Sequence, residues 1–357
     1  MNYYYILPKN NTPLKLFFSF NEIDTETSPV FISHTLVHSL SYIKTHIQNY
    51  NPVEIAEISK NINPYEFIFT NVLSDNTNMS ISKIKPCSNI FFELIEITQS
   101  LFIFENSFFN KNINILHVSN MNHKTSIELL INTVRNKEQY NDDKYFYSFD
   151  DYCIDDYCID DCININTVDT DKIIYDFIML DCIENQTHKI IISLNIILSY
   201  LSIGGTAIIK IPSLYDKVII DFLFIVCNVF EKVQLIKPLV SNILTNEKYI
   251  VCNNYQGGSK YEFSNNGEYN ACKHVSSLLQ TTLPSFFISK IEEFNVIYGQ
   301  QQLEAYDQLI NIIDNENKLD KIEALKKINI QKSITWCEKY KIPCNKFIEK
   351  YNIFLNV

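Results

Sequence analysis

Three ionisable residues lie at the ends of hydrophobic segments that are typical of strands. Asp181 ends YDFIMLD, Lys210 lies in GGTAIIKIP, and Glu247 precedes KYIVC. Isoleucines flank Lys210, and burying an ammonium group without a partner is costly, so this pattern predicts carboxylates beside it. A lysine held by two acids can handle a proton if the sheet brings the three residues together. A structural ion pair at a sheet edge is the alternative, and the spacing alone favours neither.

The segments around these residues predict an α/β fold with a mostly parallel sheet and helices on both faces. From about Lys111, short β-branched or aromatic runs alternate with amphipathic segments, as crossover connections require. The expected strands are residues 113–119, 145–149, 175–181 and 206–211, and the expected helices are residues 126–136, 189–203 and 215–230. Two further strands, residues 232–237 and 248–252, should form an antiparallel pair that closes one edge of the sheet.

Changes in composition divide the chain into three predicted regions. Residues 1–75 form an N-terminal α/β extension with a helix over residues 34–50, and residues 76–256 form the main domain. A segment that holds three of the six glycines then introduces residues 257–357, which are predicted to be helical from about Val275 to Val357, with a stop at Pro343 and a final short helix after it. Apolar stripes with charged opposite faces make this last region a candidate for docking a protein partner.

The chain of 357 residues has 46% hydrophobic residues and a net charge of -11, which excludes a disordered tail. Nucleic-acid binders usually carry clustered cations, so any RNA contact should be a local lysine groove. Ten cysteines without a secretory leader predict reduced thiols in an intracellular, cytoplasmic protein. The longest apolar run, residues 190–209, contains Asn195 and the Gly204-Gly205 break, so a buried helix and strand are expected rather than a membrane span.

Two groups of residues have the spacing of metal ligands. His34 and His38 would share one face of a helix, but no third ligand accompanies them. The repeat DDYCIDDYCIDDC places Cys153, Cys158 and Cys162 among aspartates. Its perfect repetition is typical of replication slippage in a solvent loop, because a metal site does not need identical spacer residues. The sequence therefore predicts no metal site.

The order of several motifs resembles the FtsJ-type (RrmJ-like) ribose 2′-O-methyltransferases. These motifs are SNIFFELIE, DFIMLD, GGTAIIK, KPLVS and EKYIVC, and together they span about residues 82–255. Cap-methylating members of the family occur in eukaryotes and large DNA viruses, where the host cytoplasm or the virion would be the location. The resemblance implies a Rossmann-like methyltransferase sheet for the main domain.

The resemblance also implies roles for single residues. The family uses a K-D-K-E tetrad, of which the last three members correspond to Asp181, Lys210 and Glu247. Lys210 would orient the ribose 2′-hydroxyl and help to deprotonate it for attack on the methyl group of S-adenosylmethionine, with proximity supplying much of the rate. The first tetrad lysine corresponds to Glu93, and Asn89 and Asn242 replace two family arginines.

The cofactor loop departs further from the family pattern. The family has an acidic residue and a turn rich in Gly and Pro after its first strand, whereas this chain reads HVSNMNHK from His117 and has no glycine before Gly204. Side chains in such a turn would crowd the cofactor, since glycines allow its close approach. Ser119 and Asp150 are the remaining candidates for cofactor contacts. Lys83, Lys85 and Lys237 are the candidates for RNA phosphate contacts.

These features favour a protein with the FtsJ-like fold and weakened or lost catalysis, which acts as a partner or scaffold in RNA capping or modification. One alternative is an active S-adenosylmethionine-dependent RNA 2′-O-methyltransferase. The other is a structural or virion-associated protein that uses the fold for docking. RNA, including capped mRNA, is the expected ligand in the first two cases.

Overall fold

The computed structural model describes residues 4–10, 14, 19–20, 29–72, 80–119, 121–135, 140, 142–149, 173–180, 187–257, 275–315 and 318–345. Several predictions concern residues outside these ranges. They are the tetrad position Asp181, the cofactor candidate Asp150, the repeat with Cys153, Cys158 and Cys162, and the short helix expected after Pro343.

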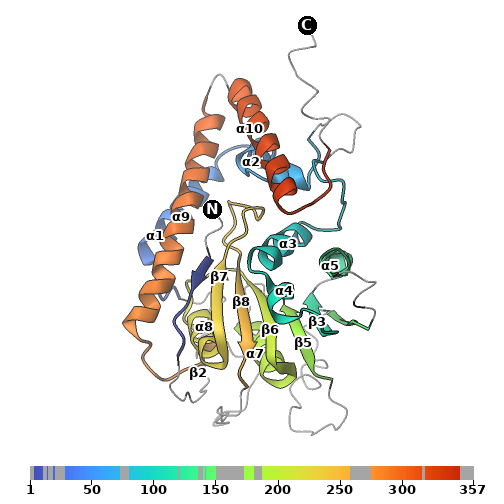
Figure 1. The fold of residues 1–357 in the computed structure, drawn as a ribbon. Coiled ribbons are helices and arrows are strands. Elements are labelled where there is room, and N and C mark those ends of the chain that lie inside the picture. The colour runs from blue at the N-terminus through green and yellow to red at the C-terminus, as the bar shows by residue number, and fades with distance from the viewer. Residues whose placement is uncertain are drawn as a thin grey trace.

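The described residues form a seven-stranded mixed sheet in the order β1-β7-β8-β6-β5-β3-β4 (Figure 1). Strands β4, β3, β5 and β6 are parallel, and β8 is antiparallel to both β6 and β7. The bounds are β1 Tyr4–Ile6, β3 Asn114–Ser119, β4 Lys144–Phe149, β5 Tyr175–Leu180, β6 Leu201–Ile211, β7 Phe230–Ile236 and β8 Lys248–Tyr255. The predicted α/β class, a Rossmann-like, mostly parallel sheet with helices on both faces, is confirmed.

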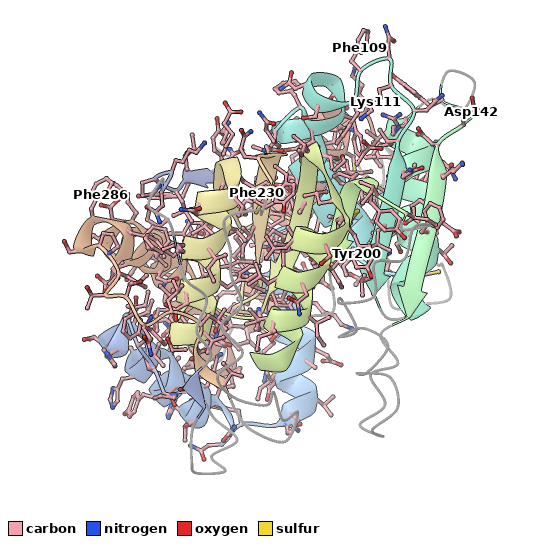
Figure 2. All side chains as sticks on the ribbon, turned by 90° about the horizontal axis from the view of Figure 1, so that it is seen from below. Phe109, Lys111, Asp142, Tyr200, Phe230 and Phe286 are labelled. Carbon is pink, nitrogen blue, oxygen red and sulfur yellow. The ribbon has the colours of Figure 1, made fainter. Side chains whose placement is uncertain are left out.

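Two hydrophobic cores lie on opposite faces of this sheet because successive side chains of a strand point to opposite sides. In β5, Ile178 and Leu180 belong to the core that contains α7 (Thr187–Tyr200) and α8 (Lys217–Val229). Phe177 and Met179 belong to the other core, under α3 (Ile90–Ser100), α4 (Ile103–Ser107) and α5 (Met121–Val134). Figure 2 shows α7 and α8 in front of the sheet, with Tyr200 at the end of α7.

Two predicted boundaries in the main domain are wrong. The antiparallel pair β7 and β8 does not close the sheet, because β1 from the N-terminal region pairs with β7 and forms the edge. Helix α7 ends at Tyr200 rather than at residue 203, and Leu201 already pairs with Tyr175. The pairing of β5 with β6 shifts register between Tyr175 and Phe177, and Gly204 has a positive φ of 83°. These two irregularities let β6 begin before the glycine pair, so strand pairing replaces the last predicted turn of α7.

The N-terminal and C-terminal regions pack together beside the sheet. Helix α1 (His34–Ile47) and α2 (Pro52–Ile62) share a third core with α9 (Ser285–Ile313). The strand β9 (Val275–Ser277), where a helix was predicted, pairs with β2 (Ser19–Phe20). Helix α10 (Lys318–Lys339) runs back across the carboxyl end of the sheet above α3 (Figure 1). It ends before Pro343, the predicted stop.

Candidate active site

Lys210 and Glu247 form an ion pair at the carboxyl end of β6. The Lys210 Nζ lies 2.9 Å from the Glu247 Oε2, and the two side chains are 15% and 47% exposed. Lys210 alternates with Ile209 and Ile211 along β6, so it shares the face of the sheet that α3 covers. The predicted pairing of these two residues is confirmed, although solvent access to Glu247 weakens the attraction.

Glu93, which was predicted to correspond to the first tetrad lysine, is a buried carboxylate on α3. The Tyr249 hydroxyl, which is also buried, donates a hydrogen bond of 2.5 Å to the Glu93 Oε2. The Asn89 Nδ2 donates to the other oxygen at 3.2 Å and to the Val240 carbonyl at 3.0 Å. Tyr249 is the register partner of Lys210, and the Lys210 Nζ lies 6.0 Å from its ring centroid. The tyrosine therefore connects the Glu93 carboxylate with the Lys210 ion pair.

Lys237 contributes a second ammonium group to this cluster. Its Nζ donates to the carbonyl oxygens of Thr245 at 2.9 Å and Glu247 at 3.1 Å, which ties together the two ends of the loop between β7 and β8. Burial and the charge of Lys210 lower the pKa of Lys237 to about 8, while Glu93 and Glu247 oppose the shift. In the structure this ammonium group clamps the β7–β8 loop. Its contact with an RNA phosphate stays a prediction.

Glu96, one helical turn after Glu93, was not predicted from the sequence. The backbone N–H groups of Leu239 and Val240 donate to its carboxylate at 2.8 and 3.3 Å, and the Trp336 indole N–H donates at 2.9 Å. Burial raises the pKa of Glu96, and these hydrogen bonds oppose the rise. Glu96 thereby fixes the β7–β8 loop between α3 and α10. The available signal was a second carboxylate on the apolar helix segment NIFFELIEI.

The cofactor side of the site is described only at β3. Ser119 is the last residue of β3 and His117 lies two residues earlier, within the strand. Both side chains are fully buried at the end of the strand. Ser119 and Asp150 as cofactor contacts and Asp181 as a catalytic residue stay predictions.

The remaining predicted cations lie farther along the surface. Lys83 and Lys85 are exposed in the segment that precedes α3. The Lys83 backbone N–H donates to the Pro343 carbonyl at 2.8 Å, and Ser82 bridges Cys344, so this segment lies beside the C-terminal end of α10. Within the described residues, no group of three or more His, Cys, Asp or Glu side chains is arranged to hold a metal ion. In the same residues, no helix has the length and apolarity required to cross a membrane.

The sole arginine of the chain, Arg135, has a structural role. It is buried at the end of α5, and its Nε and Nη2 donate to the two oxygens of Asp143 at 2.5 and 2.9 Å. Its Nη2 also donates to the Lys111 carbonyl at 2.7 Å. This clamp joins α5 to the start of β4, so lysines are the cations left for contacts with an anionic ligand.

No protein-family model matches the sequence, and no curated protein matches it. Among solved structures, a protein described as a ribosomal RNA methyltransferase from Plasmodium falciparum is similar at 20% identity and a TM-score of 0.34, over 48% of this chain and 99% of that chain. A fibrillarin pre-rRNA processing protein from Methanococcus jannaschii is similar at 10% identity and a TM-score of 0.25, over 41% of this chain and 68% of that chain. At such identities the likeness concerns the fold alone.

Proposed function

We propose that this protein binds RNA through an FtsJ-like methyltransferase fold in which methyl transfer is weakened or lost, and that it acts as a partner or scaffold in RNA capping or modification. The observation that carries this proposal is the anchored Glu93 carboxylate. It stands where the resembling family has a lysine, and it is held in place by Tyr249 and Asn89. A negative charge there opposes the approach of a ribose with its flanking phosphates.

The charges of the whole cluster support the same proposal. Two ammonium groups, on Lys210 and Lys237, lie among two carboxylates, on Glu93 and Glu247. Counted over the described residues, the cluster is therefore balanced without a ligand and has no surplus cation for the oxyanion that forms when a 2′-hydroxyl loses its proton. Lys210 is only 15% exposed, so loss of its carboxylate partner would leave a largely buried charge, which gives the pair a structural reason to persist even where catalysis is lost.

An active 2′-O-methyltransferase is the second candidate, and the retained pair of Lys210 and Glu247 favours it. S-adenosylmethionine would supply the methyl group in that case. Lys210 would position the ribose hydroxyl, and Lys237, with its pKa lowered to about 8, would carry a neutral amine in about one tenth of the molecules at about pH 7. The Asp181 side chain belongs to this candidate mechanism as a further proposed acid.

Two measurements on the full chain distinguish these candidates. Calorimetry with S-adenosylmethionine should show no binding, and transfer of labelled methyl groups to capped RNA should not exceed that of the Lys210→Ala variant. A micromolar dissociation constant for the cofactor, with methyl transfer that Lys210→Ala abolishes, would establish the enzyme instead. Absence of both cofactor binding and RNA binding would favour the structural or virion-associated role.

A further inference from the structure

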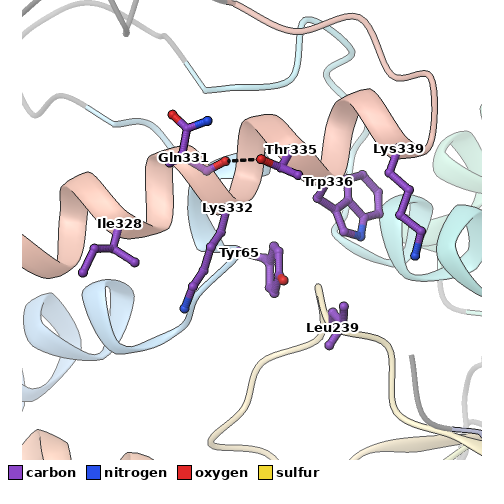
Figure 3. A pocket seen from close by; sticks show the side chains of 8 residues that line it. All are labelled: Tyr65, Leu239, Ile328, Gln331, Lys332, Thr335, Trp336 and Lys339. Atoms are coloured by element: carbon purple, nitrogen blue, oxygen red, sulfur yellow. Dashed lines mark hydrogen bonds between the residues drawn. The ribbon is translucent and has the colours of Figure 1, made fainter. Parts of the chain in front are cut away.

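A groove of about 420 Å³ lies between α10 and the β7–β8 loop (Figure 3). Its walls include two aromatic rings, of Tyr65 and Trp336, and two lysines, Lys332 and Lys339. We propose that this groove binds single-stranded RNA next to the nucleotide that lies at the candidate active site. The inference takes its ligand class from the proposed function, but it does not require methyl transfer.

The side chains of the groove have the chemistry that holds a flexible nucleic-acid strand. In Figure 3, Lys332 and Lys339 lie on either side of Tyr65 and Trp336. The Trp336 ring is only 3% exposed and belongs to the buried wall of the groove, whereas the Tyr65 ring is half-buried and can stack with a base. Ammonium groups on either side of such a ring can contact phosphates of any sequence. Within the described part of the chain, no acidic side chain pairs with Lys332. The Lys339 ammonium donates to the Tyr340 hydroxyl at 3.0 Å and remains exposed.

Charge complementarity favours a polyanion at this place. Helix α10 carries six lysines and three acidic residues, a net charge of +3, in a chain whose net charge is -11. The exposed lysines of the segment before α3 add to it, because that segment pairs with residues 343 and 344 just beyond α10. Helix α10 thus forms part of the local lysine groove that the acidic composition requires of an RNA-binding protein.

The groove is also connected rigidly to the candidate active site. Glu96 holds both Trp336 and the β7–β8 loop, and Glu93 lies one turn earlier on the same helix. The three N–H donors that the buried Glu96 carboxylate accepts offset part of its negative charge. We therefore expect a strand that stacks on Tyr65 to continue toward the pair of Lys210 and Glu247.

Trp336 is the only tryptophan of the chain, so its fluorescence reports directly on the groove. Titration with a short oligoadenylate RNA, without cofactor, should quench this fluorescence. Losing one phosphate contact should weaken binding about eightfold at about 50 mM salt and about threefold at about 200 mM, from a salt slope of about 0.7 per contact on a single strand. We expect this effect for Lys332→Gln. The matched control Lys321→Gln removes an exposed lysine about 16 Å away on the same helix and should change affinity less than about twofold.

A second variant, Tyr65→Leu, keeps apolar volume and removes a stacking surface, so it should weaken RNA binding about tenfold with little change in salt slope. Thermal melting of each variant checks that the fold is retained. Equal losses for Lys332→Gln and Lys321→Gln would overturn the proposal, as would equal quenching by polyglutamate, which would assign the groove to an acidic protein segment. Binding that persists in Lys210→Ala while methyl transfer is absent would support the groove and leave the question of catalysis separate.

Discussion

Replacing Lys248 with methionine should stabilise the fold, and most strongly in mildly acidic solution. Lys248 opens β8, is 3% exposed, and lies on the sheet face opposite Lys210. Its Nζ lies 5.4 Å from the ring centroid of Tyr215 and 5.9 Å from that of Phe294. No carboxylate in the described residues pairs with it. Burial, with smaller contributions from Lys237 and Lys44, lowers the pKa of Lys248 to about 7.

The size and sign of the effect follow from this pKa. A fall from 10.5 to about 7 corresponds to about 5 kcal/mol of unfavourable free energy for the charged form in the folded state. Below pH 7 both states hold the proton and the full cost is present. Between about pH 7 and 10.5 the unfolded state binds more protons, so stability rises with pH until the cost is gone. Methionine removes the cost, and the lost ring contacts, about 1 kcal/mol each, offset part of the gain.

Urea denaturation of both proteins at pH 6 and pH 9 measures this difference. The stability advantage of Lys248→Met should shrink by about 3 kcal/mol between the two pH values, because the cost falls from about 5 to about 2 kcal/mol. Lys321→Met, at an exposed position, should change stability by only tenths of a kcal/mol at either pH. An advantage that does not vary with pH, or a less stable methionine variant at pH 6, would refute the assigned pKa and its cause.

Three further substitutions test the packing around the site. Arg135→Lys should lower the free energy of unfolding by about 2 kcal/mol in urea denaturation, because lysine cannot reproduce the forked contact with Asp143. Glu96→Ala should cost about 3 kcal/mol by leaving the Trp336 indole and two loop amides without their acceptor, and the fluorescence of Trp336 should shift. Gly205→Ala should cost about 3 kcal/mol or more and lower the melting temperature, since a Cβ there would lie 2.8 and 3.0 Å from two backbone oxygens; an unchanged melting temperature would contradict this packing.

The extent to which the sequence predicted the fold depends on how local each signal was. The strands of the parallel sheet were recognisable because apolar runs such as YDFIML are long enough to predict a buried strand on their own. The edge strand β1 was missed, since three residues carry no periodicity and gain their structure from β7. The end of α7 was misplaced for a related reason, because pairing with β5 overrode the helical pattern.

The candidate site shows the same division between local and distant signals. The apolar neighbours of Lys210 predicted a carboxylate partner, because a buried ammonium group without one is costly. Glu247, at the start of a nearby predicted strand, is that partner. The contact between Glu96 and Trp336 joins residues 240 positions apart, so no local sequence pattern predicts it. The burial of Lys248 was equally hidden, since it depends on Tyr215 from before α8 and Phe294 from α9.

The charge-balanced cluster around Lys210 and the basic helix α10 are separate places, which explains how the protein could bind RNA without modifying it. At the candidate active site, the described residues supply two ammonium groups and two carboxylates, so this cluster should attract a polyanion weakly. On α10, lysines outnumber acids and Lys332 has no acidic partner in the described residues. Affinity should therefore depend on α10 and chemistry on Lys210. Lys332→Gln and Lys210→Ala should then act independently, and the free-energy changes of the double variant in RNA binding should add. Strong coupling between them would mean that the strand contacts both places as one site.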